Sequence, residues 1–155
     1  MAVAHASGPA RALVPDLARG SPVEATIVLA EDDPNLRALY AEWLRRAGHR
    51  VCEAGDGAEA VAQVRACRPD LLLLDIWMPI LNGLEVLEQL SQVQQAVGMR
   101  VVVLSCQDDS DTRLEGYALG ITDYWTKDLS LTELSRRVEA VLGLAPTQSL
   151  PPEIP

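Results

Sequence analysis

Five short apolar runs alternate along the chain with longer segments in which apolar residues recur every three or four positions. The runs predict strands at Thr26–Ala30, Arg50–Ala54, Leu71–Leu74, Val101–Leu104 and Ile121–Trp125. The intervening segments predict helices over Pro34–Ala47, Gly57–Cys67, Leu84–Gln95, Ser110–Leu119 and Leu131–Leu142. Five strand–helix units in a row predict an α/β fold, with one parallel sheet and helices on both of its faces.

Proline and glycine positions mark the ends of these elements and of the domain. Asp33 followed by Pro34 is a typical helix start, and Gly143 follows the last helix. Seven of the ten prolines lie before Thr26 or after Ala145. We therefore predict a disordered N-terminal extension over residues 1–24, a folded domain over 25–144, and a Pro-rich tail or linker over 145–155.

Composition and charge exclude several classes of protein. The formal net charge of -9 argues against direct binding of nucleic acid or of an anionic membrane surface. No apolar run is long enough to span a bilayer, and the first residues lack the pattern of a secretory signal. The three cysteines form no CxxC pair, which predicts neither a disulfide framework nor a zinc site. These features favour a globular protein of the reducing cytoplasm.

Polar residues that could bind a ligand or take part in a reaction follow four of the five predicted strands. Glu31, Asp32 and Asp33 follow the first, Asp75 the third, Ser105 the fourth and Lys127 the fifth. The carboxyl ends of parallel strands meet at one edge of the sheet, where such folds bind ligands. Lys127 is the only lysine, because the other twelve basic residues are arginine.

The residue types at this edge suit phosphoryl transfer. Convergent carboxylates attract a hard divalent cation such as Mg²⁺, and a carboxylate can accept a phosphoryl group as an acyl phosphate. A hydroxyl and an ammonium then stabilise the phosphoryl oxygens. We predict Asp75 as the nucleophile and Asp32 as the principal metal ligand, with Glu31 acting through metal-bound water. Singly, each residue has a structural explanation, and Asp33 is interpreted as a helix N-cap.

Four segments together resemble the response-regulator receiver domain over residues 25–143. They are Ile27–Asp33, Leu71–Gly83 with its Met78-Pro79, Val101–Ser105 and Gly120–Lys127. The resemblance implies a doubly wound, flavodoxin-like (βα)5 fold with strand order 2-1-3-4-5. It also implies that the domain is not an enzyme, beyond catalysing its own phosphotransfer and dephosphorylation.

The resemblance also implies roles and partners. Asp75 would accept a phosphoryl group from a sensor histidine kinase or a phosphotransfer protein, with Mg²⁺ held by Asp32, Asp75 and the backbone carbonyl of Trp77. Ser105 and Tyr124 match the family's switch pair. A downstream protein or an output domain absent from this chain would read the switch. The resemblance allows a homodimer through the fourth helix, fifth strand and fifth helix, but it does not fix the oligomeric state.

One residue departs from the family pattern and leaves alternatives open. Asp128 stands where the family usually has a proline after the lysine, and we expect a trans peptide bond there. The second hypothesis is accordingly a phosphorylation-independent receiver that acts as a binding module. An aspartyl phosphatase would need a carboxylate where Trp77 stands, and a flavin protein would need a phosphate-binding loop in place of Glu31–Asp33.

Overall fold

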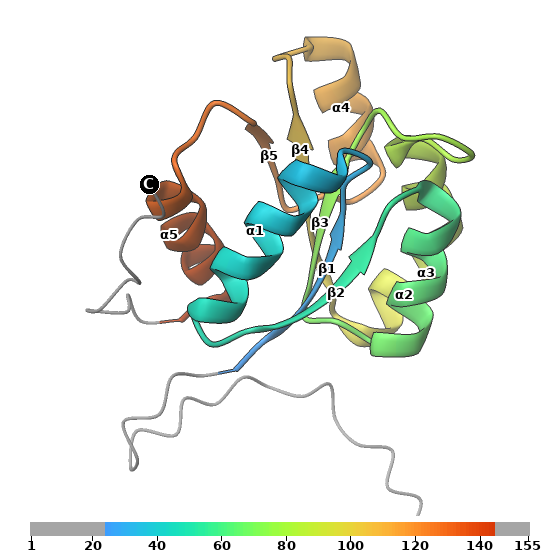
Figure 1. The fold of residues 1–155 in the computed structure, drawn as a ribbon. Helices are drawn as coiled ribbons and strands as arrows, with labels where there is room; N and C mark the ends of the chain where they lie inside the picture. Colours follow the sequence, from blue (N-terminus) through green and yellow to red (C-terminus); the bar gives the residue numbers. More distant parts are fainter. Residues whose placement is uncertain (1–23, 145–155) are drawn as a thin grey trace, which may run out of the picture.

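The computed structural model describes residues 24–144, apart from the side chains of residues 95–97. The predicted tail at 145–155 lies outside the described residues, as does all but Glu24 of the predicted extension. Five parallel strands form one sheet in the order β2-β1-β3-β4-β5, with helices on both faces (Figure 1). The predicted fold and strand order are therefore confirmed.

The elements lie close to their predicted positions. The strands are β1 (Thr26–Ala30), β2 (Arg50–Ala54), β3 (Leu71–Asp75), β4 (Arg100–Ser105) and β5 (Asp123–Thr126). The helices are α1 (Pro34–Arg46), α2 (Gly57–Cys67), α3 (Gly83–Val97), α4 (Ser110–Ala118) and α5 (Leu131–Leu142). Two ends differ from the prediction by two residues: α3 ends at Val97 and not at Gln95, and β5 begins at Asp123 and not at Ile121. Thr122 precedes the strand, and its hydroxyl accepts a hydrogen bond from the Val101 backbone N–H at 3.2 Å.

The central strands are buried on both faces because their side chains alternate between two cores. In β3, Leu72 and Leu74 pack with α2 and α3, whereas Leu71 and Leu73 pack with α1 and α5. All four of these leucines are fully buried. Two apolar layers thus cover the faces of the sheet. The predicted site residues lie at its carboxyl edge, between these layers and solvent.

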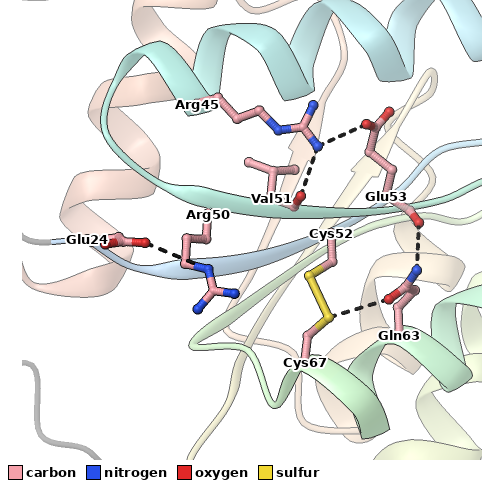
Figure 2. Close-up of a disulfide and its surroundings, with 8 residues drawn as sticks. All are labelled: Glu24, Arg45, Arg50, Val51, Cys52, Glu53, Gln63 and Cys67. Atoms are coloured by element: carbon pink, nitrogen blue, oxygen red, sulfur yellow. Dashed lines mark hydrogen bonds and ion pairs between the residues drawn. A yellow bond between two sulfur atoms is a disulfide. The ribbon is translucent and has the colours of Figure 1, made fainter.

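The cysteines correct one prediction from the sequence. The structure joins Cys52 of β2 to Cys67 of α2 in a disulfide (Figure 2). Cys106 is free and exposed. The expectation of no disulfide relied on the absence of a short spacing motif. These two cysteines are 15 residues apart and meet because α2 packs on the edge strand β2.

None of the helices in the described part of the chain has the length and apolar character needed to cross a membrane.

Candidate functional site

The carboxyl edge of the sheet brings together Glu31, Asp75 and Lys127. Asp75 is the last residue of β3, Glu31 follows β1, and Lys127 follows β5. The Lys127 Nζ lies 2.6 Å from Glu31 Oε2 and 3.2 Å from Asp75 Oδ2. Both carboxyl side chains are buried, and the lysine side chain is only 10% exposed. One ammonium therefore bridges two carboxylates that would otherwise repel each other.

Asp32 joins this cluster from the solvent side. One carboxylate oxygen each from Glu31, Asp32 and Asp75 can be chosen so that all lie within 4.8 Å of one another, and Asp32 is exposed. Three carboxylates against one ammonium leave an excess of negative charge beside an opening to solvent. The donors are all oxygen, which is what Mg²⁺ prefers. The residues present therefore fit a Mg²⁺ ion at this position.

The environment of Asp75 favours its protonated form. Burial, followed by the nearby charge of Glu31, raises the pKa of the Asp75 carboxyl, and these effects outweigh the opposing ion pair with Lys127 and the bond from the Trp77 N–H. The pKa of Asp75 rises from 3.8 to about 7. For Lys127, burial opposes the charge, but the hydrogen bond to Glu31 and the charges of both carboxylates leave its pKa raised.

Ser105 and Tyr124 are linked through the backbone of Gln107. Ser105 is the last residue of β4 and is buried, and its Oγ accepts a hydrogen bond from the Gln107 N–H at 3.3 Å. Tyr124, on β5, is also buried and donates its hydroxyl to the Gln107 carbonyl at 2.8 Å. Arg113 of α4 lies over the Tyr124 ring, 5.1 Å from its centre. The predicted switch pair is thus connected through the backbone N–H and carbonyl of Gln107, which belong to two successive peptide groups.

The loop between β3 and α3 carries Trp77 and is held by two close glycine contacts. A Cβ on Gly57 would lie 2.0 Å from the Leu81 carbonyl oxygen, and one on Gly83 would lie 2.7 Å from the Asp75 carbonyl oxygen. Only glycine allows the loop to lie this close to α2 and to the end of β3. The Trp77 N–H donates to Asp75 Oδ1 at 3.2 Å, and its side chain is 66% exposed. The role of its carbonyl as a metal ligand stays a prediction.

Two predictions about neighbouring residues are confirmed. Asp33 caps α1, because its carboxylate accepts hydrogen bonds from the backbone N–H groups of Asn35 and Leu36. The described residues contain no cis peptide bond, so the bond between Lys127 and Asp128 is trans as expected. The Asp128 carboxylate accepts a hydrogen bond from the Thr126 hydroxyl.

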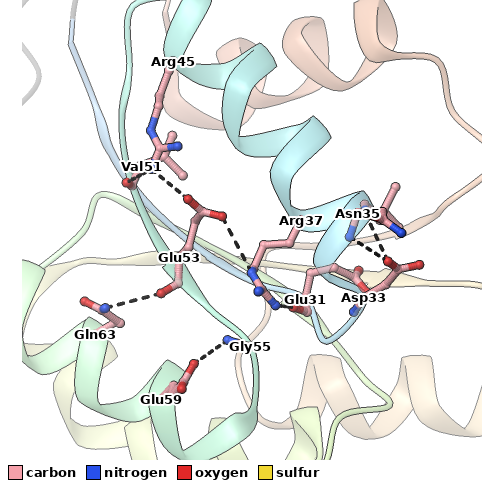
Figure 3. Close-up of polar contacts among 11 residues, drawn as sticks. Glu31, Asp33, Asn35, Arg37, Arg45, Val51, Glu53, Gly55, Glu59 and Gln63 are labelled. Carbon is pink, nitrogen blue, oxygen red and sulfur yellow. Dashed lines mark hydrogen bonds and ion pairs between the residues drawn. The ribbon is translucent and has the colours of Figure 1, made fainter.

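Sequence reasoning missed the direct contact of Glu31 with Lys127 and the part played by Arg37. The pattern assigned Glu31 to metal-bound water, whereas here its carboxylate is the nearer of the two partners of Lys127. Arg37 of α1 donates to the Glu31 carbonyl at 2.8 Å (Figure 3). No pattern in the sequence marks this contact, because every residue offers a backbone carbonyl as an acceptor.

Comparison with known proteins gives a consistent picture. A family model described as the response regulator receiver domain matches residues 27–139. The chain is 36% identical over 125 residues to the probable transcriptional regulatory protein TcrX of Mycobacterium tuberculosis, covering 81% of this chain and 52% of that protein. It is 31% identical to protein PilH of Pseudomonas aeruginosa, covering 77% of this chain and 98% of that protein.

Solved structures show the same fold. The receiver domain of a Francisella response regulator aligns with a TM-score of 0.68 and 28% identity, covering 77% of this chain and 97% of that one. The chemotaxis protein CheY4 of Vibrio cholerae aligns with a TM-score of 0.71 and 25% identity, covering 76% and 98%. The chain spans only about half the length of several curated relatives, among them TcrX and the Bacillus subtilis alkaline phosphatase synthesis regulator PhoP (48%).

Proposed function

Because the chain belongs to the response-regulator receiver domain family of two-component systems, we propose that Asp75 accepts a phosphoryl group from a phosphohistidine. The donor is a sensor histidine kinase or a phosphotransfer protein. One observation carries the proposal: Lys127 lies 3.2 Å from the Asp75 carboxylate in a pocket whose other carboxylates, Glu31 and Asp32, suit Mg²⁺. Such a domain is a signalling module and not an enzyme in its own right.

The transfer step needs the ionised form of Asp75. Its carboxylate oxygen attacks the phosphorus atom, a P–O bond forms as the donor's P–N bond breaks, and the released imidazole nitrogen takes up a proton. Asp32, Asp75 and the Trp77 carbonyl, with Glu31 acting through water, would hold Mg²⁺. The ion would supply positive charge that lowers the pKa of Asp75 and reduces repulsion of the phosphoryl oxygens. The Lys127 ammonium lies 3.2 Å from the Asp75 carboxylate, and the Ser105 hydroxyl lies at the end of the neighbouring strand. Both groups would stabilise the phosphoryl oxygens once the group is transferred.

Ser105 and Tyr124 would transmit the phosphorylation signal to the surface of the domain. A phosphoryl group that forms a hydrogen bond with the Ser105 hydroxyl would weaken the bond between Ser105 and the Gln107 N–H. The Tyr124 hydroxyl donates to the Gln107 carbonyl, so a shift of Gln107 would also move Tyr124. We propose that the change reaches the face formed by α4, β5 and α5, on which Leu114 and Tyr117 of α4 are exposed. That face would bind a downstream protein, an output domain or a second copy of the chain.

The domain's surroundings follow from the same proposal. We propose a cytoplasmic location, where a kinase can reach the site, and no direct contact of this chain with nucleic acid or membrane, given its net charge of -9. The names of TcrX and PhoP describe them as transcriptional regulators, each about twice as long as the matched region. Any transcriptional role of this chain would therefore depend on parts or partners beyond the receiver.

Labelling by acetyl phosphate tests the proposed function. Wild-type protein should gain one phosphoryl group in the presence of Mg²⁺ and none with a chelator, and Asp75→Asn should gain none. Asp33→Asn is the matched control, because it changes a neighbouring carboxylate to a side chain that caps helices equally well. It should label like the wild type. A folded wild-type protein that takes no phosphoryl group from acetyl phosphate would favour the phosphorylation-independent binding module.

A further inference from the structure

We propose that Arg37 is a positioning residue, which fixes the Glu31 peptide so that the Glu31 carboxylate holds Lys127 beside Asp75. Arg37 lies on the second turn of α1, outside the carboxylate pocket, and its side chain is 23% exposed. Its importance for phosphoryl transfer rests on the function proposed above, whereas its effect on the position of Lys127 does not.

The guanidinium of Arg37 reaches two strands at once (Figure 3). Its Nη1 donates to the Glu31 carbonyl at 2.8 Å, just beyond β1, and its Nε lies 3.7 Å from the carboxylate of Glu53 on the edge strand β2. Gly55 leaves room for it, since a Cβ there would lie 2.9 Å from Arg37 Nη1. A planar guanidinium with donors in several directions suits such a double contact better than an ammonium does.

Glu31 needs an anchor because it has just left the sheet. Its N–H still bonds to the Ala54 carbonyl at 3.0 Å, but the paired residues of β1 and β2 end at Ala30 and Ala54. The Glu31 carbonyl lies beyond the last paired residues of β1 and β2, and it accepts its hydrogen bond from Arg37. The backbone of Glu31 is thereby held from both of its polar groups.

The side chain of Glu31 converts this anchoring into the position of Lys127. Its Oε1 accepts a hydrogen bond from the Asp33 N–H at 3.2 Å, and its Oε2 pairs with Lys127 at 2.6 Å. A continuous series of contacts therefore runs from Glu53 through Arg37 and Glu31 to Lys127. Rotation of the Glu31 peptide would move its carboxylate, and Lys127 would move with it relative to Asp75.

The simpler explanation is that Arg37 only tethers α1 to β2, and Arg45 provides a matched control for it. Arg45 lies on the same helix and binds the same Glu53 carboxylate at 3.0 Å, together with the Val51 carbonyl at 2.9 Å (Figure 2). The contacts of Arg45 are with β2 and not with Glu31. A tethering role predicts equal effects for the two arginines, whereas a positioning role predicts an effect on Lys127 for Arg37 alone.

Because Lys127 is the only lysine, lysine labelled with ¹³C and ¹⁵N gives NMR signals from this one side chain. The full chain is compared at one pH, without Mg²⁺ or phosphodonor, as wild type, Arg37→Gln and Arg45→Gln. We expect Arg37→Gln to shift the Lys127 Nζ and Cε signals by more than a linewidth and Arg45→Gln to leave them in place. Unchanged signals in Arg37→Gln, or equal shifts in both variants, would overturn the proposal.

Two further measurements keep the result interpretable. If Arg37→Gln fails to fold, Arg37→Met replaces it, since methionine keeps an unbranched apolar side chain but donates no hydrogen bond to the Glu31 carbonyl. Unchanged Lys127 signals in that variant also overturn the proposal. The initial rate of labelling by acetyl phosphate should fall about tenfold in Arg37→Gln, as is typical when an outer residue orients a metal-site ligand. Equal rates in a wild type and variant that both label would contradict it. A wild type that does not label at all would count against the proposed function, and the Lys127 signals alone would then decide the role of Arg37.

Discussion

Replacement of Asp75 by asparagine should change how the stability of the protein depends on pH. The Asp75 side chain is 5% exposed, and burial followed by the charge of Glu31 raises the pKa of its carboxyl to about 7. The folded protein therefore holds a proton on Asp75 more tightly than the unfolded chain does. The resulting stabilisation is complete below pH 3.8 and is lost as the pH rises through about 7. Asparagine does not titrate and lacks this dependence.

The size of the effect follows from the shift in pKa. A rise from 3.8 to about 7 is about 3 units, which at ~1.4 kcal/mol per unit gives an upper bound of about 4 kcal/mol. The pocket opens to solvent beside the exposed Asp32, and water screens charges there. Only about 2 of the 3 units lie above pH 5, which lowers the bound to about 3 kcal/mol in the range from pH 5 to pH 8.5. With screening, we expect the wild type to lose about 2 kcal/mol of unfolding free energy relative to Asp75→Asn in this range.

Urea unfolding of both proteins across this pH range, without divalent cations, measures the difference. Burial also lowers the pKa of the His49 imidazole, but His49 is present in both proteins, so its contribution to their difference cancels. Addition of Mg²⁺ at pH 8.5 should restore stability to the wild type far more than to the variant. A difference that stays constant with pH, or a wild type that gains stability as the pH rises, would refute this explanation of the pocket.

Two other predictions concern the packing around the site and the cysteine pair. Gly57→Ala should lower the unfolding free energy in urea by about 2–3 kcal/mol, because its Cβ would lie 2.0 Å from a carbonyl oxygen of the β3–α3 loop. Gly143→Ala, at φ +70 but with open space around it, should cost only about 1 kcal/mol, and equal costs would argue against the close loop contact. Titration of thiols in the unfolded protein should find one, from Cys106, before reduction and three after it. Three reactive thiols before reduction would contradict the pairing of Cys52 with Cys67.

The fold could be predicted because its signals are local and repeated. Leu71–Leu74 is aliphatic at every position, which indicates a strand covered on both faces, and the structure buries all four leucines. Asp33 and Pro34 mark the start of α1 as expected. The sequence predicts a start of β5 two residues too early, because Ile121 is apolar and adjoins the strand. In the structure Ile121 is buried before the strand begins, where it packs against Gly116 of α4.

The composition of the site could also be predicted, but its internal pairing could not. The site residues end or follow parallel strands, and the carboxyl ends of such strands lie at one edge of the sheet. This placement is enough to predict that Glu31, Asp32, Asp75 and Lys127 lie near one another. Lys127 lies nearer to Glu31, at 2.6 Å, than to Asp75, at 3.2 Å. This difference depends on the path of the backbone beyond each strand, which the sequence pattern does not specify. The contact of Arg37 with a backbone carbonyl carries no sequence signature, because any residue offers that acceptor.

The disulfide shows the same limit for contacts between elements. Cys52 and Cys67 meet because α2 packs against the edge strand β2 and ends at Cys67. A spacing rule for cysteines describes motifs within one turn or loop, and it has no information on how a helix packs on a strand. Such a pairing follows from tertiary structure.

The central claim is that Asp75 is the phosphoryl acceptor of a receiver domain. Its most direct test is tandem mass spectrometry of the protein after incubation with acetyl phosphate and Mg²⁺, with borohydride used to convert any aspartyl phosphate to a stable homoserine. The account predicts that the modified residue is Asp75, in the peptide that contains Trp77. Modification at Asp32 or at Glu31 in its place, or none in a folded protein, would contradict it.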